Sequence, residues 1–230
     1  HAAEADAIIA SEFKLETVTA PDGRTLTPQA VVAEARKRLG WSDELTASDR
    51  AFIQRLMLRY ARQGRCVARL KGGDPCIFGR GGEEAAWLQA HGIEAELVNG
   101  ITAGLAGATQ CGISLTLRGV SRGVTLVTAH TQDDSLLNWQ ALAQGGTTLV
   151  VYMAVSKLEE VQRGLLEGGL AADTPVAMIE NASLPQQREQ RSTLTHMSDA
   201  ARSFKLCSPA ILVIGEVAAQ DASALLQLTA

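Results

Sequence analysis

The 230-residue sequence lacks several features that would place it in a specialised class. Its four cysteines lie far apart without C-x-x-C spacing, and its histidines do not cluster, so we expect no zinc site and no disulfide framework. No run of 18 apolar residues occurs, which predicts no membrane-spanning helix. The opening residues, HAAEAD, contain no basic segment leading into an apolar one. We therefore expect a cytoplasmic protein without a signal peptide or a metal.

Net positive charge is also lacking. Lysine and arginine number 21 against 25 acidic residues, which gives a net charge of −4 and argues against a nucleic-acid partner. Residues 51–80 nevertheless hold seven basic side chains and one acidic one, Asp74. The basic residues are Arg55, Arg59, Arg62, Arg65, Arg69, Lys71 and Arg80. Such a run is usually a solvated helix face, and a substrate rich in carboxylates or phosphates is the alternative.

Short apolar runs alternate with amphipathic segments along the chain, at 46% hydrophobic and 20% charged residues. This pattern predicts a folded α/β protein with one large or two modest domains. We expect strands at 7–9, 66–70, 96–98, 124–128, 147–153, 175–179 and 210–214. We expect helices at 29–39, 48–64, 83–90, 102–110, 136–143 and 157–166. A boundary at 117–123 would give two α/β domains, 1–119 and 120–230, with a cleft between them.

The segment 69–84, RLKGGDPCIFGRGGEE, is the strongest candidate for a ligand loop. It has five glycines within eleven residues, directly after an expected strand and before an expected helix. Ligands of open α/β sheets bind at the carboxyl ends of strands, and glycine lets a ligand approach the main chain. The loop is neither a Walker A motif nor G-x-G-x-x-G, because Lys71 precedes the glycines. Arg80, beside Glu83 at the helix start, can bind a carboxylate through two parallel hydrogen bonds. The alternative is an Arg80–Glu83 pair that only steadies the helix.

Three further strand-to-loop junctions occur at 99–104, 152–153 and 179–182. Taken singly, each is more typical of a helix cap, a core methionine or a turn than of a functional site. Their order along the chain matters more than any one of them.

Together these segments resemble the uroporphyrinogen-III C-methyltransferases of the tetrapyrrole methylase family. The resemblance rests on the 69–84 loop and on NGITA at 99–103, GISLTLR at 112–118, VTAH at 127–130, VYM at 151–153 and SPAILVIGEV at 208–217. It covers residues 56–218 and is most similar to the stand-alone enzymes of sirohaem, cobalamin or haem d1 synthesis, the haem d1 type above all.

The resemblance implies S-adenosylmethionine as methyl donor, S-adenosylhomocysteine as product, no metal, and a homodimer of two α/β domains with the donor in the cleft. By position, the donor-binding residues would be Gly72, Gly73, Asp74, Ile77, Thr102, Ala103, Met153, Ala182 and Ala210. The glycines would admit the nucleoside, and Asp74 would hold its amino or hydroxyl groups.

The implied reaction is methyl transfer to C2 and then C7 of uroporphyrinogen III, which gives precorrin-2. The substrate carries eight carboxylates, for which arginine forks are natural partners. The resemblance places Arg80 and Arg118 at positions facing the tetrapyrrole. Glu83 would handle a proton or orient Arg80. These three residues are the expected catalytic set.

The first 50 residues depart from the family pattern. The family opens with a strand and a G-x-G-P-G-D-P loop, whereas residues 1–9 resemble the end of the following helix and the next strand. We therefore expect the sequence to begin about one β-α unit late. The family's Y-D-R-L-V, whose aspartate is a proposed proton acceptor, aligns with ASEF at 10–13, which has no aspartate. The family's G-K-R aligns only loosely with 36–38. Cys76 and Ala129 replace the commoner Phe or Val and Gly.

Three hypotheses follow. The first is an active bis-methylating enzyme acting on uroporphyrinogen III. The second is a methyltransferase acting on a later precorrin, which the long 69–84 signature disfavours. The third is a non-catalytic or fragmentary protein that binds a tetrapyrrole or S-adenosylmethionine, favoured by the missing opening loop and the missing aspartate.

Overall fold

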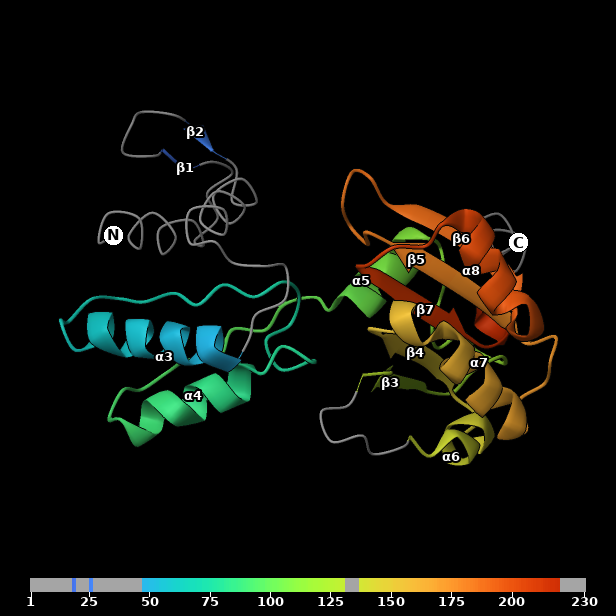
Figure 1. Cartoon of the computed structure of the whole chain (residues 1–230), viewed down its shortest axis with the longest axis horizontal. Helices are drawn as coiled ribbons and strands as arrows, with labels where there is room; N and C mark the ends of the chain where they lie inside the picture. Colours follow the sequence, from blue (N-terminus) through green and yellow to red (C-terminus); the bar gives the residue numbers. More distant parts are fainter. Residues whose placement is uncertain (1–17, 20–24, 27–46, 131–136, 220–230) are drawn as a thin grey trace. The chain divides into compact units, whose positions relative to one another are not determined.

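The computed structural model describes residues 18–19, 25–26, 47–130 and 137–219 (Figure 1). Its internal contacts divide the chain into unit 1, His1–Gly100, and unit 2, Ile101–Ala230. The strand expected at 7–9 and the helix expected at 29–39 lie outside the described residues. The domain boundary expected at 119/120 stays a prediction.

The described residues of unit 1 form two helices and one short strand pair. Strands β1 (Val18–Thr19) and β2 (Thr25–Leu26) pair antiparallel, and the helices are α3 (Ala47–Ala61) and α4 (Gly81–Ala90). Ile53 and Met57, four residues apart on α3, pack with Leu88 of α4 in a small buried cluster. This spacing places both side chains on one face of the helix, which explains why α3 faces α4.

The strands expected at 66–70 and 96–98 do not form in the structure. Both predictions were wrong for the same physical reason. A strand persists through a hydrogen-bond ladder with a neighbour, and the described strands of unit 1, β1 and β2, pair only with each other. The apolar segment 96–98 has no neighbouring strand among the described residues to pair with, and its residues Leu97 and Val98 are exposed.

Unit 2 is built on a five-stranded mixed sheet in the order β3-β4-β7-β5-β6. The strands are β3 (Val124–Thr128), β4 (Thr148–Tyr152), β5 (Pro175–Glu180), β6 (Arg188–Thr193) and β7 (Ala210–Ile214). Only β3 and β4 run parallel, and the other three pairs are antiparallel. The carboxyl ends of β3, β4 and β5 therefore share one edge of the sheet with the first residues of β7 and β6. We call this the carboxyl edge.

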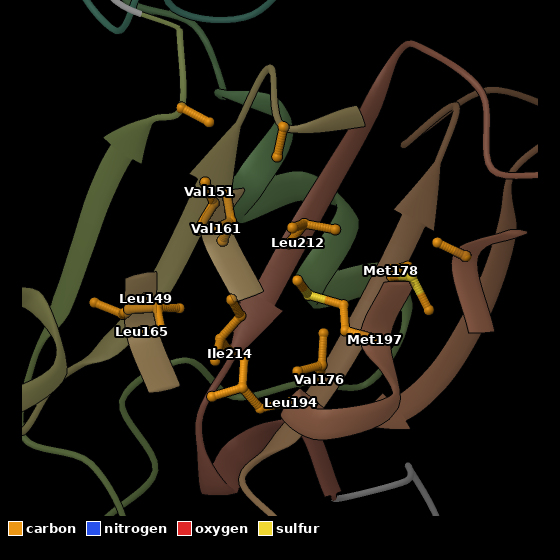
Figure 2. Close-up of a cluster of buried hydrophobic side chains, with 13 residues drawn as sticks. Leu149, Val151, Val161, Leu165, Val176, Met178, Leu194, Met197, Leu212 and Ile214 are labelled. Atoms are coloured by element: carbon orange, nitrogen blue, oxygen red, sulfur yellow. The ribbon is translucent and has the colours of Figure 1, made fainter. Parts of the chain in front are cut away.

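One face of this sheet carries the main core of unit 2. Alternate residues of β4, β5 and β7 point to that face, and Figure 2 shows Val151, Met178 and Leu212 among them. The core is closed by side chains of α7 (Leu158–Glu167), the 3-10 turn η2 (Leu194–His196) and α8 (Met197–Phe204). The other described elements of unit 2 are α5 (Ala103–Gln110), α6 (Trp139–Gln144), η1 (Val155–Lys157) and η3 (Glu216–Ala219). None of the helices in the described ranges has the length and hydropathy of a membrane span.

Helix α5 covers the opposite face, and its glycines make this close approach possible. A Cβ added at Gly104 would lie 2.4 Å from Tyr152 Oη and 2.5 Å from Val150 Cγ1. A Cβ at Gly107 would lie 2.9 Å from Ala182 Cβ. Because a side chain at either position would collide with the sheet, the small residues of α5 hold its first turn beside the carboxyl edge.

Among the strands and α-helices described in unit 2, β6 and α8 had no counterpart among the expected ones. The β6 sequence, REQRST, has no apolar alternation, so nothing in it predicts a strand. It forms because β5 offers a free edge along six paired residues. The α/β class expected from the sequence is confirmed by this alternation of helices and a central sheet.

Candidate active site

The loop 69–84 of unit 1 is braced by an ionic cluster at its base. Lys71 Nζ lies 2.8 Å from Glu84 Oε2 and donates a 2.7 Å hydrogen bond to the Gly79 carbonyl. Arg69 Nε lies 3.3 Å from the same carboxylate oxygen. Two members of the basic run thus hold the loop to the first turns of α4.

The glycines of this loop have two different roles. A Cβ at Gly79 or at Gly81 would lie 2.7 Å from the Pro75 carbonyl oxygen, and the Gly81 amide donates to that oxygen at 2.8 Å. The absence of a side chain at these two positions therefore lets the loop pack tightly against the Pro75 carbonyl. A Cβ at Gly72 or Gly82 would meet nothing within 4 Å. The open space at Gly72 is where the main chain is accessible to a ligand.

Asp74 ties the loop to the junction at residue 100. Its Oδ1 accepts from the Cys76 amide at 2.8 Å, and its Oδ2 accepts from the Gly100 amide at 3.2 Å. Gly100 approaches so closely that a Cβ there would lie 2.3 Å from the Gly73 carbonyl oxygen. Asp74 thus builds the loop through both carboxylate oxygens, and each oxygen keeps a further lone pair for a ligand.

Arg80 and Glu83 form a fork at the start of α4. Arg80 Nε lies 3.0 Å from both carboxylate oxygens of Glu83, and Nη2 donates to Oε2. The hydrogen bond to Glu83 raises the pKa of Arg80 above its ordinary value. The Arg80 side chain is 38% exposed and that of Glu83 61% exposed, so the fork faces solvent.

The backbone that presents this fork is strained. Phe78 and Arg80 both have left-handed φ values, 55° and 57°. Non-glycine residues rarely adopt this conformation, and it costs about 1–3 kcal/mol where it occurs, most often at functional sites. The closed turn at Pro75 holds both residues in place.

In unit 2, the carboxyl edge brings Met153, Ala182 and Ala210 to one end of the sheet. Met153 follows β4 and Asn181 follows β5, with left-handed φ values of 54° and 52° that turn the chain away from the sheet. Glu180 is the register partner of Ala210, and the Asn181 amide donates to the Pro209 carbonyl at 3.0 Å. Met153 is 49% exposed, so its side chain is open to a ligand.

The start of α5 joins the same edge through Tyr152. The Gly104 amide donates to Tyr152 Oη at 3.0 Å, and Thr102 Oγ1 lies 2.8 Å from that oxygen. Thr102 is buried and Ala103 is exposed. The five expected donor-binding residues of unit 2 are therefore gathered at one edge by β4, β5, β7 and α5.

A buried carboxylate, Glu180, secures this edge. It accepts from Arg188 Nε at 3.2 Å and Nη2 at 2.7 Å, and from the Cys207 amide at 2.9 Å. The Arg188 hydrogen bonds, followed by the Cys207 amide, hold the pKa of Glu180 below its ordinary value. Sequence reasoning named neither Glu180 nor Tyr152 as a site residue. The only signal was their position, as the last residues of two strands.

Arg118 is not gathered with these residues. It is exposed on a turn whose flanking residues, Leu115 and Ser121, hydrogen-bond Thr148 at the start of β4. This turn lies at the end of the sheet where β4 begins, opposite the end that carries Met153. Arg80 and Glu83 belong to unit 1, so the expected catalytic residues are distributed over both units.

Comparison with known proteins decides the family. The model of the tetrapyrrole (corrin/porphyrin) methylases matches residues 2–198. The chain belongs to the tetrapyrrole methylase family. A uroporphyrinogen-III C-methyltransferase of Pseudomonas aeruginosa is 66% identical over 193 residues, which cover 84% of this chain and 79% of that relative. One of Pseudomonas fluorescens is 64% identical over 203 residues, 88% of this chain and 81% of the relative.

Solved structures agree with this tetrapyrrole methylase assignment. The uroporphyrin-III C-methyl transferase of Thermus thermophilus, complexed with S-adenyl homocysteine, matches with a TM-score of 0.64 and 36% identity over 73% of each chain. The fold class expected from the sequence is thereby confirmed, and with it the methyltransferase class.

The residues at the carboxyl edge fit an adenine nucleoside that carries a sulfonium. Ala182 and Ala210 have side chains too small to cover their main-chain groups, and Met153 offers an exposed apolar surface. In unit 1, the space at Gly72 leaves the peptide groups there uncovered. Main-chain donors and acceptors beside small apolar side chains are typical of such sites.

Proposed function

We propose that this chain is a uroporphyrinogen-III C-methyltransferase that methylates C2 and then C7 of uroporphyrinogen III to give precorrin-2. The observation that carries the proposal is its 66% identity to the Pseudomonas aeruginosa enzyme over 84% of the chain. When bound, S-adenosylmethionine supplies an electrophilic methyl group on its sulfonium. The protein then has to position the acceptor carbon in line and exclude water.

Two groups of residues are proposed to bind S-adenosylmethionine. The loop of unit 1 contributes Gly72, Gly73, Asp74 and Ile77, and the carboxyl edge of unit 2 contributes Thr102, Ala103, Met153, Ala182 and Ala210. The uncovered backbone at Gly72 and the exposed Met153 support this assignment. Asp74 acts first by holding the loop closed, because both of its oxygens accept backbone amides.

On the acceptor side, Arg80 binds a substrate carboxylate and Glu83 orients it. The Glu83 carboxylate holds Nε and Nη2 of Arg80, while the guanidinium remains exposed on a strained turn. A positioned guanidinium binds a carboxylate with less loss of side-chain entropy than a free one. Arg118 is the second proposed clamp, and Glu83 is also the candidate for proton handling.

Mass spectrometry tests the activity. The purified chain is incubated with uroporphyrinogen III and S-adenosylmethionine, and a gain of two methyl groups is expected. Binding of both ligands without a mass gain would favour the non-catalytic alternative. Methylation of a later precorrin in place of uroporphyrinogen III would favour the second alternative.

Arg80→Lys tests the clamp, because it keeps the charge and loses the bidentate fork. We expect turnover to fall at least tenfold, by roughly the 1.4 kcal/mol that a tenfold change represents, with little change in donor affinity. Arg55→Lys is the matched control, since Arg55 is an exposed arginine on α3 outside the loop. Equal losses of turnover and donor affinity in Arg80→Lys would contradict the substrate-clamp assignment.

The proposal extends to the assembly and the setting of the protein. We infer a homodimer in the cytoplasm that serves a sirohaem, cobalamin or haem d1 pathway, closest to the haem d1 type. We also keep the division into a tetrapyrrole-binding domain, 1–119, and a domain contributing to the donor site, 120–230. Light scattering of the purified 24.3 kDa chain tests the dimer, because a dimer has twice that mass.

A further inference from the structure

Tyr152 places a polar atom at the packing face between β4 and α5. It is the last residue of β4, and its side chain is 8% exposed, beneath helix α5. Its Oη lies 3.0 Å from the Gly104 amide nitrogen and 2.8 Å from Thr102 Oγ1. The amide can only donate, so the phenol oxygen accepts from it and shares a second hydrogen bond with the buried threonine.

The phenol oxygen of Tyr152 replaces the N-cap side chain of helix α5 as a hydrogen-bond acceptor. Thr102 occupies the N-cap position of α5 with extended backbone, but its side chain makes no capping hydrogen bond. The first amides of a helix have no partner within the helix and normally bond to the N-cap side chain. Here the Gly104 amide bonds instead to a tyrosine 48 residues away in sequence. The position of the first turn of α5 is thus set by the end of β4.

The same residue is directly bonded to a second expected donor-binding residue. Tyr152 is followed directly by Met153, whose left-handed φ of 54° begins the turn at the carboxyl edge. Thr102 and Ala103 lie on the α5 side of the phenol oxygen, and Met153 lies on the strand side. The main chain of Gly104 lies close against Tyr152, because a Cβ added there would be 2.4 Å from Oη.

We propose that Tyr152 is a positioning residue for the methyl donor: its hydroxyl fixes Thr102 and Ala103 against Met153, so that the carboxyl edge is preorganised to receive the donor. This inference rests on the proposed function, which assigns those three residues to donor binding. Tyr152 itself acts through its neighbours. It therefore affects donor affinity and not the chemical step.

Tyr152→Phe is the test, because it removes one oxygen and keeps the ring that fills the space. Titration calorimetry with S-adenosylhomocysteine on the full chain measures the effect. We expect Kd to rise about tenfold, the change that corresponds to losing the net value of one or two buried hydrogen bonds. At saturating donor, kcat should stay within about twofold and the KM for uroporphyrinogen III should not change, since only ground-state donor binding is affected.

The chain offers a matched control in its other tyrosine. Tyr60 is buried to 6% exposure on α3 of unit 1. Tyr60→Phe should leave the Kd for S-adenosylhomocysteine unchanged. If Tyr152→Phe binds as tightly as the wild type, or if its kcat falls while its Kd holds, the positioning role is overturned.

Thr102 supplies a second route that does not depend on the stability of Tyr152→Phe. Thr102→Val keeps the shape and loses the hydroxyl, and should raise Kd, whereas Thr102→Ser keeps the hydroxyl and should restore tight binding. Because Thr102 and Tyr152 share one hydrogen bond, the two losses should not add in the double variant. Additive losses would overturn the shared role. A wild-type chain that fails to bind S-adenosylhomocysteine would overturn the proposed function itself, whereas equal binding by wild type and variants would overturn only this inference.

Discussion

Gly104→Ala probes how closely helix α5 must approach the sheet. The new Cβ would lie 2.4 Å from Tyr152 Oη, 2.5 Å from Val150 Cγ1 and 2.9 Å from Tyr152 Cζ, whereas ordinary contact begins at 3.4 Å. Val150 is fully buried and Tyr152 is 8% exposed, so neither side chain has free space to move into. The backbone at Gly104 is not left-handed, so the conflict is one of space alone.

Two effects oppose each other in this variant. Alanine in place of glycine favours a helix by about 1 kcal/mol. Overpacking of a close-fitted core costs about 1–3 kcal/mol, and displacement of the phenol oxygen from the Gly104 amide costs about 1 kcal/mol more. The costs exceed the gain. We expect the free energy of unfolding to fall by about 1–3 kcal/mol.

Urea unfolding followed by far-UV circular dichroism measures this change, with Gly82→Ala as the matched control. Gly82 is also near the start of a helix, but a Cβ there meets nothing within 4 Å. The control should gain up to about 1 kcal/mol from helix propensity. A Gly104→Ala variant as stable as Gly82→Ala, with unchanged affinity for S-adenosylhomocysteine, would refute the close contact between α5 and the sheet.

Three further predictions concern unit 2. The pKa of the Glu180 carboxylate is lowered in the folded protein, so the stability that this carboxylate contributes is present above pH 4.5 and is lost as the pH falls through the folded-state pKa. Glu180→Gln should therefore make the free energy of unfolding depend less on pH in this acidic range. An unchanged acid-unfolding curve in the variant would contradict this role of Glu180. A Cβ at Gly164 would lie 2.4 to 2.6 Å from the Trp139 indole, so Gly164→Ala should lower the unfolding free energy by about 1–3 kcal/mol in thermal melts, and Trp139→Leu should relieve the loss. Burial raises the pKa of the Cys111 thiol to about 12, so iodoacetamide at pH 8 should alkylate the exposed Cys66 well before it, as peptide mass mapping would show; equal rates would contradict the burial.

The sequence predicted the strongly periodic and strongly β-forming segments well. The expected strands at 124–128 and 210–214 have these bounds in the structure, because both are rich in β-branched residues; the sheet buries four of the five residues of β7, and those of β3 are half-buried. The strands predicted at 66–70 and 96–98 failed because strand formation depends on a neighbour as well as on composition. β6 was missed for the converse reason. Its sequence, REQRST, is polar, and it forms a strand because β5 supplies hydrogen-bonding partners along its whole length.

The candidate site shows a similar division. The glycine-rich loop and the Arg80–Glu83 fork were predictable from a motif of sixteen residues. The ionic brace from Lys71 to Glu84 was not, because it joins residues thirteen positions apart through side chains whose direction only the fold determines. The Tyr152 contact was beyond sequence reasoning for the same reason, since its partners are 48 and 50 residues away.

The strand order of unit 2 has a consequence for synthesis of the chain. β7 lies between β4 and β5, although it is the last strand of the sheet to leave the ribosome. The β3–β4 and β5–β6 pairs can form early, but the strand that hydrogen-bonds to both β4 and β5 is available only when residues 210–214 have been made. A nascent chain stopped before that point lacks the strand that pairs with both β4 and β5, and its carboxyl edge lacks Ala210. On the proposed role of the carboxyl edge, methyl-donor binding should therefore arise only after β7 has been translated.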